Sequence, residues 1–283
     1  MNKNHKGVVL ITGASSGIGQ ACANHLHQKA YRVYGTTRQA QPHATGILGA
    51  EDIYPPAFEM IQMDVNDDNS VAQGVEFILD REGRLDVVVN CAGFGVAGSI
   101  EDTTIKEAKL QLETNFFGAV RLCRAALPIM RKQHSGYIVN VSSIAGLIGV
   151  PFQGMYSASK FALEGMTEAL RLELKPFGIR VVLIEPGDFN TQFTAHRRKT
   201  LASQHNGVYL EKFTAALGVM EADETRGPSP VKIARLLEHI IETPSPRLRY
   251  LVGPVSEKVA VMLKKVLPWR LFEWALTKYY KLL

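Results

Sequence analysis

Tyr156 and Lys160 lie four positions apart, where an apolar loop gives way to a helical pattern. On a helix, residues at this spacing stand on one face, one turn apart. A lysine ammonium close to a phenol favours the phenolate, so the pair predicts a tyrosine that exchanges a proton near neutral pH. Ser143 ends the preceding apolar run and could hydrogen-bond the same substrate oxygen. The pair alone is weak evidence, because Tyr-x-x-x-Lys is common on solvated helix faces.

Strands and helices must bring these three side chains together. Apolar runs rich in β-branched residues predict buried strands at residues 7–12, 31–36, 58–65, 85–90, 136–142, 179–185 and 249–253. Helical patterns alternate with them, ending near residue 29 and then spanning 67–82, 106–132, 156–175 and 229–242. The alternation predicts an α/β fold, a doubly wound parallel sheet (Rossmann fold) of about seven strands between two helical layers. Such sheets bind ligands outside the carboxyl ends of their strands.

A glycine-rich turn, TGASSGIG from Thr12 to Gly19, joins the first predicted strand to the first predicted helix. This order of elements points backbone N–H groups and a helix N-terminus at a phosphate. The spacing is neither GxGxxG nor a Walker A loop, and the competing interpretation is an ordinary tight turn. We prefer the phosphate interpretation, which assigns cofactor contacts to Gly13, Ser15, Ser16, Gly17, Ile18 and Gly19.

The end of the second predicted strand indicates which dinucleotide binds. NAD-selective sites normally place Asp or Glu there, on the ribose 2′-hydroxyl, but residues 1–50 contain neither. The polar side chain at this point is Arg38, which could hold a 2′-phosphate by a charge-assisted contact. The sequence therefore predicts NADP(H) rather than NAD(H), the alternative being a solvated arginine.

Length and composition predict a globular catalytic domain. The chain has 283 residues, 46% of them hydrophobic and 21% charged, enough for a full core. We expect a single dinucleotide-binding domain over residues 1–253, with a flexible substrate lid at about 188–226, and an apolar, basic extension over 254–283. No apolar stretch reaches 18 residues and no secretory signal is expected. The three cysteines are widely spaced, which predicts a cytoplasmic protein without a metal site.

Seven motifs between residues 7 and 192 carry a resemblance to a known family. They are Thr12-Gly-Ala-Ser-Ser-Gly-Ile-Gly19, Asp64-Val65, Asn90-Cys-Ala-Gly93, Asn115, Ser143, Tyr156-x-x-x-Lys160 and Pro186-Gly187-x-x-x-Thr191. With them the chain resembles a single-domain short-chain dehydrogenase/reductase, and is similar to members acting on hydroxysteroids and retinol-like alcohols. One departure is Cys91, where the family usually has a second asparagine.

The resemblance implies a role for each motif. Tyr156 would be the general acid that protonates a carbonyl as NADPH delivers hydride, and Lys160 would lower its pKa and bind the nicotinamide ribose. Ser143 would orient the carbonyl, and Asn115 would hold a water that links Lys160 to solvent. Further cofactor contacts would come from Asp64, Val65, Asn90, Ala92, Gly93, Pro186, Gly187 and Thr191, with the Asn90 position credited with a structural role.

The predicted substrate pocket is apolar. Residues 144–155 contain no charge, and the predicted lid carries several aromatic side chains, which favours an apolar substrate with one carbonyl or hydroxyl. We expect a steroid, a retinoid or a long-chain keto-lipid. The charge run at 196–199 could clamp an acidic group, but is interpreted as a solvated face. Substrate contacts are assigned to Ser143, Phe94, Leu147, Phe152, Phe189 and Phe193.

The extension over residues 254–283 holds both tryptophans, six Lys/Arg and two Glu, and Pro268 divides it into two helical pieces. Pocket closure, or packing as core or subunit interface, is preferred to peripheral contact with an anionic membrane. The chain's basic excess lies here without a nucleic-acid motif, so no nucleic acid is expected as a partner. The family resemblance implies a homodimer or homotetramer through the helices at 106–132 and 156–175.

A function of another class stays open, a catalytically silent NADP(H) sensor or interaction protein on the same fold. Ser143, Tyr156, Lys160 and Asn115 are all present, which argues against it. Oxidation of NADPH in the presence of lipophilic ketones would separate the two interpretations.

Overall fold

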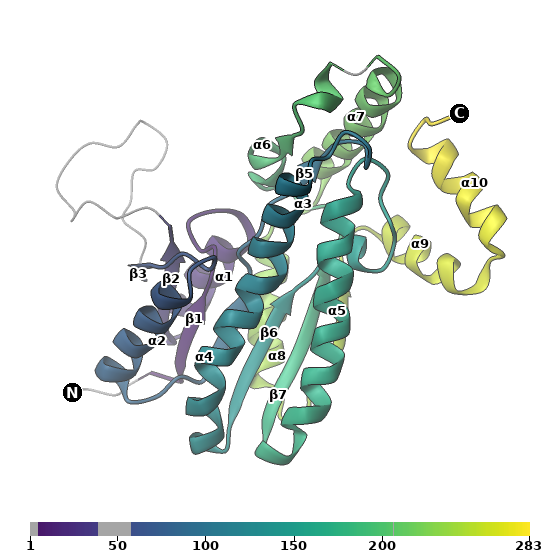
Figure 1. Ribbon diagram of the computed structural model, residues 1–283. Coiled ribbons are helices and arrows are strands. Elements are labelled where there is room, and N and C mark those ends of the chain that lie inside the picture. The colour runs from purple at the N-terminus through teal and green to yellow at the C-terminus, as the bar shows by residue number, and fades with distance from the viewer. Residues whose placement is uncertain (1–4, 39–57, 206) are drawn as a thin grey trace.

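The central sheet contains seven parallel strands, as the sequence predicts. The computed structural model describes residues 5–38, 58–205 and 207–283. Within them the strand order is β3-β2-β1-β4-β6-β7-β9 (Figure 1). The strands are β1 (Val8–Ile11), β2 (Arg32–Thr37), β3 (Glu59–Gln62), β4 (Val87–Asn90), β6 (Gly136–Val141), β7 (Ile179–Pro186) and β9 (Arg249–Val252). The order reverses between β1 and β4, so their carboxyl ends form the switch point where such sheets bind ligands.

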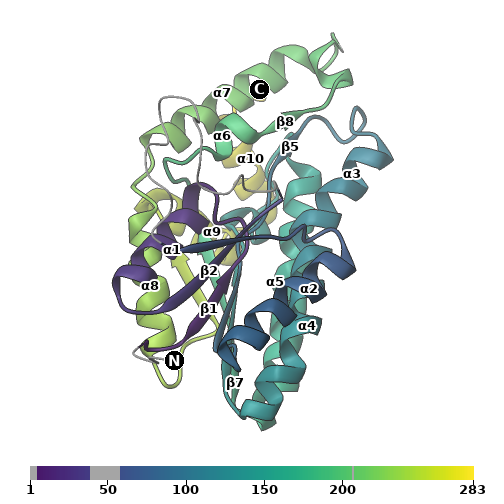
Figure 2. The same cartoon turned by 90° about the vertical axis from the view of Figure 1, so that its left-hand side faces the viewer.

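Helices cover both faces of the sheet, which confirms the predicted fold class. One face carries α1 (Gly17–Gln28) and α8 (Val231–Glu242) (Figures 1 and 2). The other carries α2 (Asp68–Glu82), α4 (Gly118–Gln133) and α5 (Gly154–Leu174). A large cluster of buried apolar side chains fills the space on each side of the sheet.

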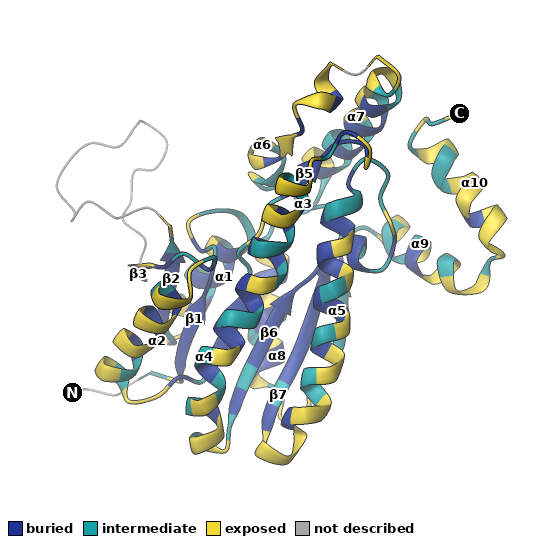
Figure 3. Ribbon diagram, in the orientation of Figure 1, coloured by how far each residue is buried: buried dark blue, intermediate teal, exposed yellow. Residues whose placement is uncertain are grey.

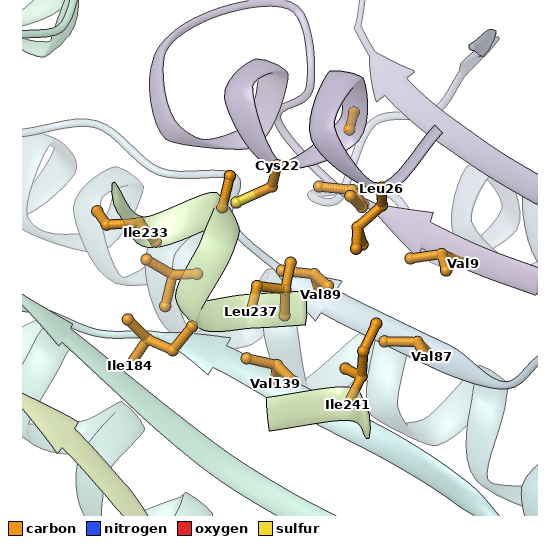
Figure 4. Packing of buried hydrophobic residues seen from close by; sticks show 14 of the residues in the cluster. Val9, Cys22, Leu26, Val87, Val89, Val139, Ile184, Ile233, Leu237 and Ile241 are labelled. Atoms are coloured by element: carbon orange, nitrogen blue, oxygen red, sulfur yellow. The ribbon is translucent and has the colours of Figure 1, made fainter. Parts of the chain in front are cut away.

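The cluster beneath α1 and α8 explains why the apolar runs fold as strands. Val9, Val87 and Ile184 from the sheet meet Leu26 of α1 and Leu237 of α8 (Figure 4). Strands covered on both faces need near-continuous apolar sequence, because successive side chains point to opposite faces and both are buried. Each such side chain contributes roughly 1.5–3 kcal/mol when it is fully buried. This packing fixes the strand ends on which the site depends.

The long helix predicted over residues 106–132 is interrupted. The structure has α3 (Ile105–Leu112), a π-helical turn (Glu113–Phe117) and then α4. A capping box between Thr104 and Glu107 begins α3. The π-helical turn contains Asn115, and such turns are rare and frequent at functional sites. The spacing of apolar residues along the sequence does not reveal a π-helical turn. Its one additional residue shifts that spacing only over a single turn.

The segment predicted as a substrate lid is built from regular elements. It contains α6 (Phe193–His196), β8 (Arg198–Lys199), a 3₁₀ turn (Ala202–Gln204) and α7 (Leu210–Arg226), while further 3₁₀ turns, Ile144–Gly146 and Lys175–Phe177, flank α5. β8 pairs with β5 (Val96–Ala97) in a small separate sheet. Arg197 is buried and forms an ion pair with Glu224. The interpretation of residues 196–199 as a solvated charge run is therefore wrong at Arg197.

The C-terminal extension forms two helices, α9 (Val255–Val266) and α10 (Trp269–Tyr279), and α10 begins directly after Pro268 as predicted. Both helices stand to one side of the sheet, with α10 extending away from it (Figure 1). Exposed residues run along much of their surface (Figure 3). Among the residues described, no helix is long and apolar enough to cross a membrane.

Candidate active site

A cavity of about 130 Å³ lies beside Tyr156. Many residues that the sequence assigns to the site line this cavity. They come from the switch point of the sheet and from the segment after β7. These are Ile18, Ser143, Tyr156, Pro186, Gly187, Phe189, Thr191 and Phe193. The glycine-rich turn, the end of β6, the start of α5 and the segment after β7 therefore meet in one place, although they are far apart in the sequence.

Tyr156 and Lys160 share one face of α5, as their spacing predicts. The Lys160 Nζ lies 5.8 Å from the centroid of the Tyr156 ring and donates a hydrogen bond to the Val141 carbonyl at 2.9 Å. Burial lowers the pKa of Lys160 from 10.5 to about 8, while the nearby Cys91 and Glu164 act in the opposite direction. The Lys160 ammonium thus lies at the end of β6, next to the ring of Tyr156.

The pKa of Tyr156 differs from the sequence-based expectation. Burial raises it from 10.0 to about 12, and a hydrogen bond with Ser143 opposes this rise. The Phe193 ring packs against the phenol with 5.6 Å between centroids, which contributes to its desolvation. In the protein alone, burial therefore decides the direction of the pKa shift of Tyr156, and the lowering expected from Lys160 stays a prediction. Ser143 and, to a smaller extent, Arg197 favour the ionised phenol, and Ser143 does so from its predicted place beside the same oxygen.

Asn115 is buried and its side chain holds the loop after β4. Its Nδ2 donates to the Phe94 carbonyl at 3.0 Å and to Ser159 Oγ at 3.2 Å. Its Oδ1 accepts a hydrogen bond from Phe94 N at 3.1 Å. Ser159 in turn donates to the Tyr156 carbonyl at 2.7 Å. The side chain thus connects the π-helical turn to the helix that carries Tyr156, and the predicted water-holding role stays a prediction.

The turn after β1 fits a dinucleotide. Gly13 and Gly17 have φ angles of 68° and 56°, in the left-handed region that favours glycine. A Cβ on Gly13 would lie 2.9 Å from the Ala92 Cα, so the turn packs directly on the loop after β4. Ser16 makes no side-chain cap at the start of α1, and no acidic residue lies in the first turn. The first N–H groups of α1 thus remain available to a phosphate.

The loop after β4 is positioned by hydrogen bonds to its neighbours. The Thr12 hydroxyl accepts from Cys91 N and Ala92 N, each at 3.1 Å. Asn90 Nδ2 donates to Asn140 Oδ1 at 2.7 Å, which agrees with the structural role that the resemblance gives Asn90. A Cβ on Gly93 would lie 3.1 Å from Asn115 Oδ1, a close approach that favours glycine.

The remaining predicted cofactor residues lie along the same edge. Arg38 follows β2 directly and is exposed. Asp64 accepts a hydrogen bond from Asn66 N at 3.0 Å, and Val65 is buried beside it. A Cβ on Gly17 would lie 3.5 Å from the Thr191 Cβ, so the segment after β7 reaches the glycine-rich turn. Their contacts with a cofactor stay predictions.

Three predicted substrate residues lie outside the cavity. Phe152 packs with Phe213 at 5.5 Å between ring centroids, and Leu147 packs under the C-terminal helices. Phe94 lies beneath the Arg198 guanidinium, 4.8 Å from its ring centroid. All three follow strand ends in sequence, but their side chains turn towards α7, α9 or β8. These three residues do not line this cavity, and their contact with a substrate stays a prediction.

The cavity also has an acidic wall that we did not predict from the sequence. It contains Asp188, Asp223 and Glu224, with Tyr280 of the C-terminal extension beside them. Burial, and then the neighbouring Glu257, raise the pKa of Asp188 well above its usual range. The sequence signal for Asp188 was its position directly after Pro186-Gly187. Nothing in the sequence places α7 or Tyr280 at the cavity.

The carboxylates of this wall outnumber the cations that face them. Glu224 pairs with Arg197 and accepts a hydrogen bond from Thr194 at 2.5 Å. Asp223 contacts the exposed Arg226 at 3.3 Å and accepts from the Tyr279 hydroxyl at 2.5 Å. Asp188 and Glu257 bond each other, and burial raises the pKa of both. Because a raised pKa favours the protonated forms of Asp188 and Glu257, and Glu224 is paired with Arg197, the negative charge of the wall comes chiefly from Asp223, whose cationic partner Arg226 is exposed.

Comparison with known proteins agrees with this geometry. Residues 7–202 match the family model described as short chain dehydrogenase. A 3-ketodihydrosphingosine reductase from Bacteroides thetaiotaomicron is 41% identical over 96% of this chain and 97% of its own length. Human retinol dehydrogenase 8 is 43% identical over 65% of this chain and 60% of its own length.

A solved structure supports the same relationship. A short-chain dehydrogenase from Streptomyces avermitilis has a TM-score of 0.78 and 33% identity, covering 98% of this chain and 96% of its own. The sheet order, the glycine-rich turn at the switch point and the Ser143–Tyr156–Lys160 arrangement are thus accompanied by similarity along nearly the whole chain. The chain belongs to the short-chain dehydrogenase/reductase family of oxidoreductases.

Proposed function

We propose that the protein uses NADP(H) to interconvert the carbonyl and hydroxyl forms of a long-chain lipid that carries an amino group next to the reacting carbon. The observation that carries this proposal is the cavity itself, in which Ser143 and Tyr156 face an acidic wall formed by Asp188, Asp223 and Glu224. When bound, the nicotinamide would supply or accept the hydride. The protein contributes the proton, the orientation of the carbonyl and the exclusion of water.

The proposed roles of the residues follow from their contacts. Tyr156 holds the transferable proton on its buried hydroxyl, and Ser143 hydrogen-bonds that hydroxyl and favours its ionised form. Lys160 holds its ammonium at the Val141 carbonyl, at the end of β6. Its pKa of about 8 lets it exchange protons close to neutral pH. Asn115 and Ser159 fix the turn of α5 from which Tyr156 projects.

The size and charge of the cavity favour one of the three expected substrate classes. About 130 Å³ is small, since pockets that enclose a drug-sized ligand are roughly 300–1,000 Å³. Ile18, Pro186, Gly187 and Thr191, which we assign to the cofactor, line the same cavity. The small volume therefore favours a linear lipid, whose alkyl chain can extend outside the cavity, over a fused steroid with its bulk beside the reacting carbon. The acidic wall attracts an ammonium group, and a steroid or a retinoid does not carry one. The relative named for 3-ketodihydrosphingosine, a long-chain amino ketone, supports the same choice.

An assay of NADPH oxidation with matched ketones tests this proposal. We expect turnover of 3-ketodihydrosphingosine and at least tenfold lower kcat/KM for a ketone of the same chain length without the amino group. Asp223→Asn should raise KM for the amino ketone about tenfold, equivalent to ~1.4 kcal/mol, and leave the neutral ketone unchanged. Glu221→Gln is the matched control, because Glu221 lies on the same helix outside the cavity wall. Equal turnover of both ketones would reject recognition of the amine.

Arg38 gives a separate prediction about the cofactor. It stands at the end of β2, where an arginine can hold a 2′-phosphate by charge-assisted hydrogen bonds. Arg38→Ser should weaken NADPH binding by about 10- to 100-fold, since a hydrogen bond to a charged group contributes roughly 1.5–3 kcal/mol. NADH binding, measured by the same fluorescence titration, should stay unchanged. Tighter binding of NADH than NADPH by the unmodified protein would contradict the cofactor assignment.

We also retain the proposal of a homodimer or homotetramer. Phe117, Phe161 and Leu172 lie on the π-helical turn and on α5, and their side chains are 44%, 42% and 73% exposed. Apolar side chains along the outer helices of a layer are suited to a partner of the same kind. Sedimentation velocity of the unmodified protein measures the state directly.

A further inference from the structure

We propose that the outer face of α9 and α10 binds an anionic membrane surface, while their inner face closes the cavity. This extends the proposed function, because a lipid substrate would then enter from the membrane on which the protein rests. The docking itself depends only on residues 255–283 and can be tested without any substrate.

The inner face of the two helices is packed against the body of the protein. Val261 of α9 and Phe272 of α10 are buried with Ile148, in a cluster that Leu147 borders. Lys264 donates a hydrogen bond to the Leu147 carbonyl. Beyond α10, Tyr280 reaches the wall of the cavity. These contacts hold the pair of helices in a fixed orientation, so their opposite face has a defined direction.

The outer face of α9 is apolar at helical spacing. Val255, Val259, Met262 and Val266 follow one another at intervals of four, three and four residues, which places them on one side of the helix. Their side chains are 74%, 44%, 66% and 75% exposed. A row of this kind on a soluble protein marks an interaction site, whereas single exposed apolar residues do not.

The outer face of α10 adds aromatic and basic residues. Trp269 and Trp274, the only tryptophans of the chain, are 61% and 53% exposed, with Leu271 between them. Lys278 lies over the Trp274 ring at 5.3 Å from its centroid, and Arg270 is exposed beside them. Tryptophan with an apolar body and a polar tip, next to basic side chains, is the composition of helices that lie in a membrane interface.

Charge decides between a membrane and a second copy of the chain. Residues 254–283 carry six Lys/Arg and two Glu. Lys264 is on the inner face, where it bonds the Leu147 carbonyl, and Glu257 faces Asp188 rather than solvent. The remaining charges are five basic side chains and one glutamate. A twofold dimer through this face would place the same basic residues opposite each other. An anionic lipid surface instead complements them, and salt would screen the attraction.

Vesicle binding of the full-length protein tests the proposal. The probes are vesicles of phosphatidylcholine alone and of phosphatidylcholine mixed with an equal part of phosphatidylglycerol. We expect sedimentation with the mixed vesicles, at least tenfold weaker sedimentation with phosphatidylcholine alone, and release at high salt. Because both tryptophans lie on α10, their emission should shift to shorter wavelength on binding. A protein that stays in the supernatant with unshifted emission would overturn the proposal.

Two pairs of matched variants locate the surface. Lys265→Glu with Arg270→Glu should reduce binding at least tenfold, while Lys132→Glu with Lys175→Glu, exposed at the far ends of α4 and α5, should not. Val259→Ser with Met262→Ser should also reduce binding, whereas Leu172→Ser on α5 should not. Circular dichroism checks that each variant is folded.

The remaining outcomes separate this proposal from its alternatives. Equal loss in the control variants would show nonspecific attraction and reject this surface. Concentration-dependent dimers that the Val259→Ser, Met262→Ser variant loses would assign the face to a second copy and also reject it. If vesicles bind as expected but no amino ketone is turned over, the proposed function fails while the docking surface stands.

Discussion

Replacement of Tyr156 by Phe should lower kcat for carbonyl reduction by about 10²- to 10⁴-fold, the contribution typical of a positioned general acid. The substitution removes only the hydroxyl, and the ring retains its packing against Phe193. The phenol is buried and has a pKa of about 12, so it is protonated throughout the neutral range and can act as the acid in reduction. Single-turnover kinetics with NADPH and the ketone would measure the loss.

A matched substitution shows whether the effect belongs to the site. Tyr137 lies on β6 and donates a hydrogen bond to the Thr243 carbonyl at 2.9 Å, away from the cavity. Tyr137→Phe should therefore change stability slightly and kcat hardly at all. The dissociation constant for NADPH should be similar in both variants and in the unmodified protein. Near-normal kcat for Tyr156→Phe would reject the proposed mechanism.

Replacement of Lys160 by Met should lower activity about 100-fold or more and change how stability depends on pH. The ammonium is buried and its pKa is about 8 in the folded protein against 10.5 in an unfolded chain. The unfolded chain therefore binds more protons between these two values, so the free energy of unfolding of the unmodified protein rises with pH there. The penalty for burying the charge is on the order of 3 kcal/mol below pH 8 and disappears towards pH 10.

Urea unfolding of the two proteins between pH 7 and pH 10 measures this difference. The stability of the unmodified protein should increase relative to Lys160→Met as the pH rises through 8, because other groups are common to both and cancel. Lys175→Met is the control, since Lys175 is exposed and should show no such trend. A difference in stability that stays constant with pH would mean that Lys160 is not protonated with a lowered pKa in the folded state.

The sheet and the residues at its strand ends could be predicted because their physical signals are local. Short apolar runs rich in β-branched residues, alternating with helical patterns, are typical of central strands, and a glycine-rich stretch between a strand and a helix is typical of a tight turn. Because all strands of the sheet are parallel, their carboxyl ends lie along the same edge. For this reason the sequence alone indicates that Ser143, Tyr156, Pro186 and Thr191 lie near each other, and all four line the cavity.

The parts that escaped prediction depend on contacts between distant segments. Arg197 is buried only because α7 presents Glu224 to it, and a charge run in isolation resembles a solvated face. Tyr280 reaches the cavity only because α9 and α10 pack on Ile148 and Leu147. The π-helical turn at Asn115 adds one residue to a helix whose apolar period otherwise looks regular. The direction in which a side chain points after the end of a strand, as for Phe152, also depends on tertiary packing.

The pairing of β7 with β9 has a consequence for synthesis of the chain on the ribosome. Leu183 and Ile184 of β7 pair with Arg249 and Tyr250 of β9, which are translated more than sixty residues later. Until β9 emerges, the nascent chain presents an unpaired and strongly apolar strand edge, the kind of surface that promotes aggregation. Chaperones that bind nascent chains should therefore engage this protein after residue 186 and release it once residue 252 is free.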